Sequence, residues 1–595
     1  MPYTAPIDDM RFVLDELCGL TDIAGLPGYG EEVPELVQQI LSEAGRLASE
    51  RIAPLNRTGD REGCLFENGV VRMPTGFKEA YRAYAEGGWN GVRIDTEFGG
   101  MGLPWVLANA VQEMWQSANM SFGLCPLLNQ SATDLLIAHG SDEQKNTFLP
   151  KLIAGEWTGT MNLTEPQAGS DLGALRTRAI RDGRHYRLHG QKIFISYGEH
   201  DLAENIVHLV LARTEDAPPG TRGISLFIVP KFLVNEDGTL GRRNDLRCVS
   251  LEHKLGIHAS PTAVMAYGDN EGATAYLVGD ENQGLRYMFT MINIVRLGVG
   301  LQGVAVAERA YQRAAEYART RVQSRAILDG DRPVHIIQHP DVRRMLMTMR
   351  AQVEATRALV YYAMAAVDRA KRHPDEEIRR HNQARVDLLT PVAKAWCTDA
   401  AVEVASLGIQ VHGGMGYIEE TGAAQYYRDV RVTSIYEGTN GIQANDFLGR
   451  KLLRDDGAAM RALMDDITAT IGELGAEPGE DFAAIRTALA SALTALEDAT
   501  RWLLAQHRSQ LEHVFAGAAA YLKLSGIAAG GWLMARAALA AYRRLGDEHD
   551  DPAFLEAKIV TARFFAEHVL VQAGGLRNTI MRGGPSVMAL PEASF

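Results

Sequence analysis

One carboxylate in this chain has a local setting suited to proton transfer. Glu437 lies between Tyr436 and Gly438 in the segment SIYEGTNGIQ at 434–443, shortly after the charged run at 428–431. A carboxylate placed among apolar groups loses hydration, so its pKa rises toward the range in which a general base is most effective. The glycine beside it allows a backbone or a flat cofactor to approach closely. A glutamate stabilised by a helix N-terminus is the competing structural interpretation.

The composition is that of a globular protein that does not bind polyanions. The chain has 595 residues, 46% of them hydrophobic and 23% charged, and a formal net charge of −14. This length predicts several domains with sizeable cores. Because no Lys/Arg block stands out, we expect neither nucleic-acid binding nor binding to an anionic membrane surface.

The N-terminus and the cysteines indicate a cytoplasmic protein. The first residues are acidic and lack a basic segment followed by an apolar stretch, and we expect no uninterrupted apolar run long enough to span a bilayer. The five cysteines are scattered and never form CxxC. We therefore predict no disulfide framework, no metal site and no integral membrane association.

The periodicity of the chain changes twice and predicts a mainly α fold with a middle β-domain. Helical spacing over 33–52 and 144–153 gives way to strand-like alternation from about 160 to 277, with a hairpin signal at Asp182-Gly183. The absence of helical patterns between those strands favours an antiparallel barrel or sandwich. Helical spacing returns from 284, and residues 455–480 are polar enough to contain a linker.

This organisation predicts four domains. They are an N-terminal helical domain at 1–159, a middle β-domain at 160–280, a helical bundle carrying the candidate base at 281–455, and an extra C-terminal helical domain at 456–595.

A loop and a strand in the β-region carry groups suited to a flat or phosphorylated ligand. Residues 161–171 offer the hydroxyls of Thr164 and Ser170, which can donate to a polar ring edge or a phosphate. The period of two places Phe194 and Ser196 on one face of a strand, where the ring could stack on a flat cofactor. A plain turn and an ordinary half-buried strand remain alternatives.

Further candidates lie in the helical part. Arg321 can form a fork onto a pyrophosphate, and Gln338 can bond to ribose or adenine. The glycines of QVHGGMGY at 410–417 allow close approach to a dinucleotide, or simply form a turn. The GxGxxG match at 298–303 has no strand before it, so we expect a run of small residues at a helix contact.

The order and spacing of these segments resemble the acyl-CoA dehydrogenase family over about residues 33–453. The most specific matches are TEPQAGSD at 164–171, QVHGGMGY at 410–417 and YEGT at 436–439. The acidic start, the RVQ sequence at 321–323 and the long helical tail are most similar to the 3-(methylthio)propanoyl-CoA dehydrogenase branch. The resemblance implies a helical domain, a β-barrel or sandwich and a helical bundle, extended here by a C-terminal helical module.

The same resemblance implies a reaction and its partners. FAD would accept the β-hydride of a short- to medium-chain acyl-CoA, with 3-(methylthio)propanoyl-CoA as a candidate substrate, while Glu437 removes the α-proton and the trans-2-enoyl-CoA forms. Electron-transferring flavoprotein is the expected acceptor, and a homodimer is the favoured oligomer. Some family branches place the base directly before the arginine equivalent to Arg296, but here that residue is Val295, which cannot accept a proton.

Individual site residues follow from the resemblance in the same way. Those implied at FAD are Thr164, Ser170, Phe194, Ser196, Arg321, Gln338, Gln410, Gly414 and Thr439. Those implied at the substrate are Ser170, Arg296 and Tyr436. Arg321 and Gln338 are expected to reach the FAD of a neighbouring subunit. The chain departs from the family pattern at Ser324-Arg325, with an apparent insertion through Asp331, and at His258.

Two other functions share these residues. An acyl-CoA oxidase would differ in letting the reduced flavin react with oxygen. A non-catalytic acyl-CoA-binding scaffold would keep the fold without the reaction, and the presence of Glu437 argues against it.

Overall fold

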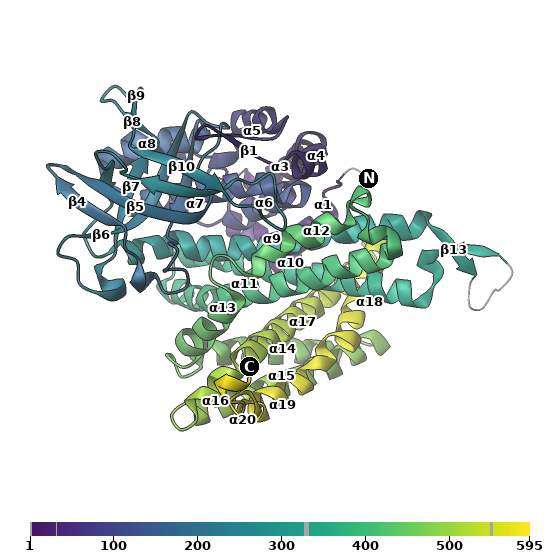
Figure 1. Cartoon of the computed structure of the whole chain (residues 1–595). Helices are drawn as coiled ribbons and strands as arrows, with labels where there is room; N and C mark the ends of the chain where they lie inside the picture. Colours follow the sequence, from purple (N-terminus) through teal and green to yellow (C-terminus); the bar gives the residue numbers. More distant parts are fainter. Residues whose placement is uncertain (1–2, 31, 326–331, 548–550) are drawn as a thin grey trace.

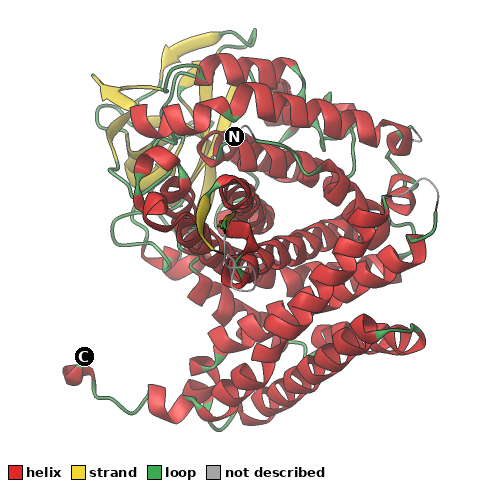
Figure 2. Cartoon of the chain, turned by 90° about the vertical axis from the view of Figure 1, so that its right-hand side faces the viewer, coloured by secondary structure: helices red, strands yellow, loops and turns green. Residues whose placement is uncertain are grey.

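The computed structural model describes residues 3–30, 32–325, 332–547 and 551–595 of the chain. In these ranges the molecule is mainly helical, with one β-domain at one end of a helical bundle and a further group of helices packed along the bundle (Figures 1 and 2). The predicted fold class is confirmed. Residues 326–331 of the predicted insertion lie outside the described residues.

Helices and one short hairpin form the N-terminal part. The helices are α1 (Ile7–Phe12), α2 (Leu20–Ala24), α3 (Val33–Leu47), α4 (Pro54–Glu62), α5 (Phe77–Glu86), α6 (Trp105–Ala118), α7 (Met120–His139) and α8 (Asp142–Ala154). The helix predicted over 33–52 is confirmed, because α3 continues directly into the π-helical segment η2 (Ala48–Ile52). The prediction contains no strand here, yet β1 (Leu65–Glu67) pairs with β2 (Val70–Arg72). Strands of three residues are too short to show a periodicity.

Eight strands of the β-domain form one sheet. They are β3 (Trp157–Asn162), β4 (Arg178–Asp182), β5 (His185–Ser196), β6 (Asn205–Thr214), β7 (Ser225–Pro230), β10 (Leu246–Leu251), β11 (Thr262–Tyr267) and β12 (Ala273–Leu277). Strands β5, β12, β7, β6 and β4 pair in a closed ring, so this part is a small barrel that β3 and the β10–β11 ladder extend. A separate hairpin joins β8 (Phe232–Val234) to β9 (Leu240–Arg243).

The pairing in this barrel is only partly as predicted. The hairpin at Asp182-Gly183 is confirmed, since Asp182 pairs with His185 and Gly183 has a φ of 64°. Most pairs are antiparallel as predicted, but β3 and β4 both run parallel to β6. The β4–β5 hairpin lies between β3 and β6 in the chain and returns it to the same direction, which periodicity alone does not reveal.

Three long helices form the core of the bundle. They are α9 (Gly284–Thr320), α10 (Pro340–Arg372) and α11 (Glu376–His412), followed by α12 (Ala423–Val430), the 3₁₀ segment η10 (Arg431–Ser434), α13 (Asn440–Asp446) and the π-helical segment η11 (Phe447–Leu452). At the end of α9 a hairpin of β13 (Val322–Arg325) and β14 (Pro333–His335) projects from the body (Figure 1). It leads into the 3₁₀ segment η7 (Ile336–Gln338) and α10.

The GxGxxG segment is confirmed as a helix-packing element. It lies inside α9, and a Cβ atom on Gly300 would stand 2.8 Å from the Ala393 carbonyl oxygen of α11. A Cβ atom on Gly303 would likewise stand 2.7 Å from the Cys397 carbonyl oxygen. Glycine is required here because the backbones of α9 and α11 approach so closely.

The C-terminal region consists mainly of α-helices. These are α14 (Ala458–Ala476), α15 (Glu480–Gln506), α16 (Leu511–Ala516), α17 (Ala518–Arg544), α18 (Pro552–His568), α19 (Ala573–Arg582) and α20 (Gly584–Val587). The linker predicted within 455–480 is wrong, because α14 occupies most of it and buries one apolar face. Met460, Leu463 and Ile467 lie on that face, at the spacing of an amphipathic helix.

Two apolar helices belong to the core. Helices α9 and α17 are long and apolar enough to cross a bilayer by length and composition, but 78% and 89% of their most apolar windows are buried inside the protein. Gly526 and Gly530 of α17 lie against the Trp396 ring of α11, so that a Cβ atom at either would stand 2.4 Å from it. This contact joins the C-terminal helices closely to the bundle.

A buried ionic cluster connects the N-terminal segment, the bundle and the C-terminal helices. Arg357 of α10 is 1% exposed and donates to Glu113 of α6 at 2.7 Å, to Glu308 of α9 at 2.8 Å and to Asp9 at 2.5 Å. Lys558 of α18 contacts Asp9 as well. Buried charges of this kind require such partners, because removing one leaves the others without compensation.

Replacement of Arg357 tests this cluster. We expect Arg357→Met to cost about 3–5 kcal/mol, because the Glu113 and Glu308 carboxylates would remain buried without their cation. Thermal unfolding followed by circular dichroism measures the effect. The control is Arg46→Met, which breaks an exposed pair with Glu43 and should leave the midpoint unchanged. Equal midpoints for the two variants would contradict a stabilising role of the cluster.

Candidate active site

A cleft of about 310 Å³ lies between the β-domain and the helical bundle. Several sequence-predicted site residues line it together, namely Thr164, Ser170, Phe194, Arg296 and Glu437. The hydroxyl and aromatic groups come from β5 and the loop after β3, and the charged groups come from the bundle. The cleft therefore presents a candidate base opposite groups suited to a flat ligand.

The loop that carries Glu437 has a strained backbone held by side chains. Glu437 and Gly438 both have positive φ angles, of 57° and 84°. The Gln443 side chain donates to both of their carbonyl oxygens, at 3.2 and 3.1 Å. Thr439 then caps the N-terminus of α13, its hydroxyl accepting from the Ile442 N–H at 3.2 Å. Non-glycine residues with positive φ persist where surrounding contacts fix them, and they concentrate at functional sites.

The electrostatic environment of Glu437 suits a general base. Burial raises the pKa of Glu437 to about 7, while the charges of Arg296 and Lys394 lower it. Arg296 lies 3.6 Å from the Asp446 carboxylate, and its buried Nε has no hydrogen-bond partner among the described residues. Asp446 also pairs with Arg450 at 3.2 Å, so two guanidinium groups lie beside the cleft.

The neighbours of Glu437 on its inner side are neutral. The Tyr436 hydroxyl donates to Gln302 on α9, and the tyrosine packs against the apolar core. Tyr436, a predicted substrate residue, thus lies behind the base rather than in the cleft lining. Val295, at the alternative base position of the family, is 1% exposed within the core.

Phe194 has a conformation that a ligand would explain. Its ring is 59% exposed at the end of β5, and its backbone has a φ of 60°. An exposed aromatic ring and a left-handed backbone each carry a free-energy cost. Ser196 follows two residues later, and the Thr164 carbonyl oxygen accepts from the Ile193 N–H at 2.9 Å. The structure thus holds the predicted ring and hydroxyl positions close together.

A buried ion pair fixes the loop that contains Thr164 and Ser170. Lys192 is fully buried and donates to Glu165 at 2.8 Å and to the Leu163 carbonyl oxygen at 3.0 Å. Glu165 also accepts from the Thr177 N–H at 3.0 Å. Burial alone would raise the pKa of Glu165, but Lys192 and the hydrogen bonds lower it to about 2. The carboxylate therefore stays ionised and anchors both ends of the loop.

The remaining predicted cofactor residues lie at the other end of the bundle. Arg296 and Arg321 are 25 positions apart on or at the end of α9, which at 1.5 Å per residue separates them by about 37 Å. Gln410 and Gly414 lie at the C-terminal end of α11 and just after it. Gln338 ends η7.

Two contacts show that Arg321, Gln338 and the segment at 410–414 lie at the same end of the bundle. The Tyr317 ring of α9 stacks on the His412 ring of α11, with centroids 4.4 Å apart. The Ile336 N–H, two residues before Gln338, donates to the Arg321 carbonyl oxygen at 2.8 Å. A single chain therefore divides the predicted cofactor residues between two distant ends, with Thr439 on the Glu437 side.

Three charged residues at the site are absent from the sequence prediction. Lys394 is the one charged residue between Asp387 and Asp399, inside an otherwise apolar stretch, and this isolation is a usable signal. Asp446 and Arg450 stand at the i, i+4 spacing of a helical ion pair directly after the YEGT segment. Only the fold brings Asp446 and Arg450 next to Arg296, so their place at the site does not follow from the sequence.

Comparisons with known proteins agree along the whole chain. Four family profiles match in order: acyl-CoA dehydrogenase N-terminal domain at 34–156, middle domain at 160–270, C-terminal domain at 282–452, and acetyl-CoA dehydrogenase C-terminal like at 463–591. A 3-methylmercaptopropionyl-CoA dehydrogenase of Ruegeria pomeroyi is 51% identical over 591 residues, covering 99% of each chain.

Solved structures share the fold over nearly the full length. Caenorhabditis elegans ACDH-11 in complex with C11-CoA has a TM-score of 0.77 at 22% identity, covering 96% of this chain and 92% of that one. An acyl-CoA dehydrogenase of Bacillus anthracis complexed with FAD has a TM-score of 0.75 at 21% identity, with the same coverage.

Two glycines of the Glu437 loop provide a matched test of its geometry. We expect Gly438→Ala to destabilise the loop by more than about 1 kcal/mol, because φ is positive and the new Cβ would stand 2.8 Å from Gln443 Nε2. At Gly441 a Cβ would meet only Thr439 Oγ1, at 3.8 Å, so Gly441→Ala should be tolerated. Thermal unfolding compares the two, and equal effects would contradict the strained-loop description.

Proposed function

Because the chain belongs to the acyl-CoA dehydrogenase family and is an enzyme of that family, we propose that Glu437 is the base that removes the α-proton of a short- to medium-chain acyl-CoA. The observation that supports this most directly is the Glu437 carboxylate, placed in the cleft with a pKa raised to about 7 by burial. At neutral pH about half of such groups are ionised, and a pKa near the operating pH is the range in which a general base is most effective.

The residues of the cleft fit FAD. The exposed Phe194 ring and its strained backbone are explained by stacking on a flat ring system. The hydroxyls of Thr164 and Ser170 in the cleft, and that of Ser196 two residues after Phe194, would hold the polar edge and phosphates of FAD. When bound, FAD supplies the acceptor for the β-hydride, and the cofactor carries the redox chemistry. A relative with the same fold is described as complexed with FAD.

The backbone of the base supports the same reaction. In the described part of the chain, the Glu437 N–H has no acceptor, so it is free to donate to the thioester oxygen. A donor aimed at that oxygen stabilises the negative charge that develops as the α-proton leaves. The positive φ of Glu437 orients this N–H and the carboxylate from one residue.

The cationic groups beside the cleft suit the CoA portion of the substrate. Arg450 is 68% exposed in its side chain and lies at the same cleft as Arg296. Guanidinium groups bind phosphate and carbonyl oxygens through several parallel donors. We take 3-(methylthio)propanoyl-CoA as the candidate acyl group, because the relative that is 51% identical over nearly the full length is named for it.

The separation along α9 supports a homodimer in which each FAD is held by two copies. One chain places Thr164, Phe194 and Thr439 near Glu437, whereas Arg321 and Gln410 lie at the far end of the bundle. A second copy running the other way would bring its Arg321 end to this cleft. Electron-transferring flavoprotein is the acceptor that we propose for the reduced enzyme.

Replacement of the base tests the reaction. We expect Glu437→Gln to retain FAD and to reduce it with acyl-CoA on the order of 10²–10⁴-fold more slowly, because the amide cannot accept the α-proton. Anaerobic flavin bleaching with a panel of acyl-CoA thioesters, including the methylthio compound, measures this and ranks the substrates. Glu420→Gln, at an exposed position, is the control.

Three outcomes would contradict this function. A Glu437→Gln variant that bleaches at the wild-type rate would exclude Glu437 as the base. Stoichiometric peroxide from the wild type in air would favour the oxidase. A wild-type protein purified without flavin, and unable to take it up, would favour the non-catalytic scaffold.

A charge reversal at the far end tests the shared cofactor site. We expect Arg321→Glu to weaken FAD retention at least tenfold, because a carboxylate would face the pyrophosphate of the partner's cofactor. Arg319→Glu changes the same charge two residues earlier on an exposed turn of α9 and should retain FAD. Flavin absorbance per protein after gel filtration measures both, and equal retention would contradict a contact through Arg321.

A further inference from the structure

A fully buried lysine lies beneath the catalytic loop. Lys394 of α11 is 0% exposed, and its Nζ donates to the Asn440 side-chain oxygen at 2.8 Å. Among the described residues it has no carboxylate partner in an ion pair. Burying an ammonium group without a counter-ion in contact is costly, so its presence needs a reason.

Asn440 connects this lysine to the base. It is the first residue of α13, three residues after Glu437, and all of its side-chain partners belong to α11. Its Nδ2 donates to Asp399 at 2.7 Å and to the Thr398 hydroxyl at 3.0 Å. The loop with two consecutive positive φ angles is thus fastened to α11 through one amide.

We propose that Lys394 is a positioning residue for proton abstraction, which fixes the Glu437 loop through Asn440 and holds the Glu437 carboxylate in its ionised form before substrate binds. The inference rests on the proposed role of Glu437 and adds to it a second group on a different helix. Lys394 is not among the residues that line the cleft, so it acts only through Glu437 and its loop.

The electrostatics agree with this placement. The positive charge of Lys394 opposes the effect of burial on the pKa of Glu437, and burial lowers the pKa of Lys394 to about 8 while Glu437 raises it. Arg296 is a further charged neighbour of both Glu437 and Lys394. Asp399 is a charged neighbour of Lys394, and Asp399 in turn has Lys523 and Arg431 as neighbours. The lysine thus counteracts part of the desolvation that raises the basicity of Glu437.

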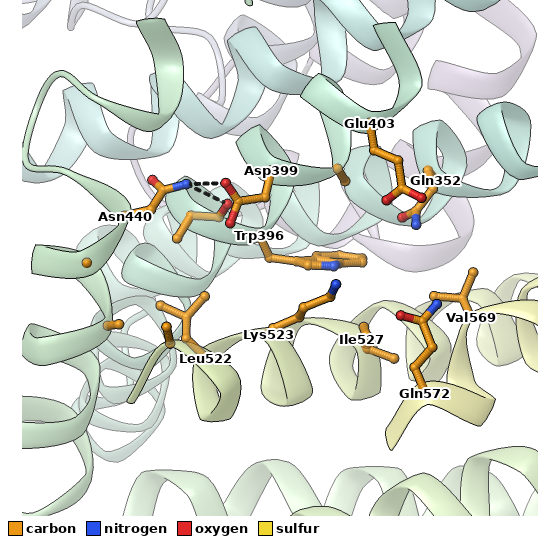
Figure 3. A pocket seen from close by; sticks show the side chains of 15 residues that line it. Gln352, Trp396, Asp399, Glu403, Asn440, Leu522, Lys523, Ile527, Val569 and Gln572 are labelled. Atoms are coloured by element: carbon orange, nitrogen blue, oxygen red, sulfur yellow. Dashed lines mark hydrogen bonds between the residues drawn. The ribbon is translucent and has the colours of Figure 1, made fainter. Parts of the chain in front are cut away.

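The C-terminal helices close the outer side of this network. Asp399 lies at the edge of a cavity of about 160 Å³ between α11 and α17, together with Lys523 and Gln572 from the C-terminal region (Figure 3). In Figure 3 the Asn440 amide is bonded to Asp399 on the bundle side, and Trp396 lies above Lys523. The extra domain thus packs against α11 beside Asn440 and Asp399, the partners through which Lys394 reaches the Glu437 loop.

The pH dependence of flavin reduction tests the inference. We expect Lys394→Met to move the acidic limb of the reduction rate to higher pH, because Glu437 loses a favourable charge. If the limb moves by about one pH unit, the variant is about tenfold slower than the wild type at pH values below the acidic limbs of both proteins. At high pH its rate recovers toward the wild-type value. The enolate absorbance of bound acetoacetyl-CoA, which has an acidic α-proton, reports the same shift without hydride transfer.

A matched control separates charge from looseness of the loop. Thr398→Val removes another Asn440 contact without changing any charge, so it should lower the rate at every pH and leave the limb in place. Asn440→Asp gives Lys394 a carboxylate partner but loses the Nδ2 donations to Asp399 and Thr398, so it should shift the limb in the same direction as Lys394→Met and also lower the rate at every pH. Circular dichroism and flavin content establish that each variant is folded.

The outcomes are distinguishable from failure of the proposed function. If Glu437→Gln abolishes bleaching but Lys394→Met and Asn440→Asp both keep the wild-type limb, the positioning role of Lys394 is wrong while the base stands. If Glu437→Gln still bleaches flavin, the proposed function itself is wrong. A limb that moves in Thr398→Val as far as in Lys394→Met would also overturn the inference.

Discussion

The burial of one carboxylate is the constraint on which the functional arrangement depends. Glu437 needs an apolar surrounding to become a strong base, yet a carboxylate removed from water must be compensated or it stays protonated. The structure meets both needs, because the Glu437 carboxylate has neutral groups on its core side and two cationic side chains among its other neighbours. Tyr436, which packs against the apolar core, supplies the first, and Arg296 and Lys394 supply the second. Removal of the neutral groups would lower the pKa of Glu437, and removal of the cations would raise it.

This balance requires that distant segments meet with little tolerance. Arg296 comes from α9, Lys394 from α11 and Glu437 from the loop before α13. The close contact of α9 with α11 at Gly300 and Gly303 sets the distance between the two cations. Glycine positions that resemble a nucleotide fingerprint in sequence therefore contribute to the site indirectly, by allowing two backbones to come close.

The sequence predicted what local chemistry determines. Periodicity, the hairpin at Asp182-Gly183 and the setting of Glu437 depend on neighbours within a few residues, and the structure contains each of them. The parallel pairing of β3 with β6 depends on how the chain crosses the barrel, which no local pattern encodes. Lys394 and Arg450 likewise gain a role only when tertiary packing brings them to residues far away in the chain. The error at α14 has a related origin, because the buried face of this helix gains meaning only from the helices that cover it.

The C-terminal helices extend the argument from the site to the architecture. A carboxylate at the surface of a smaller protein could be kept dry by a second subunit, but here α17 of the same chain covers α11 behind the catalytic loop. The Trp396 ring lies against Gly526 and Gly530, so α17 approaches α11 closely at this point. The ionic cluster at Arg357 and Lys558 joins α18 of the same domain to α1 and α10. The extra domain thereby maintains the low-dielectric surrounding in which one buried lysine can influence the base across a distance that water would screen.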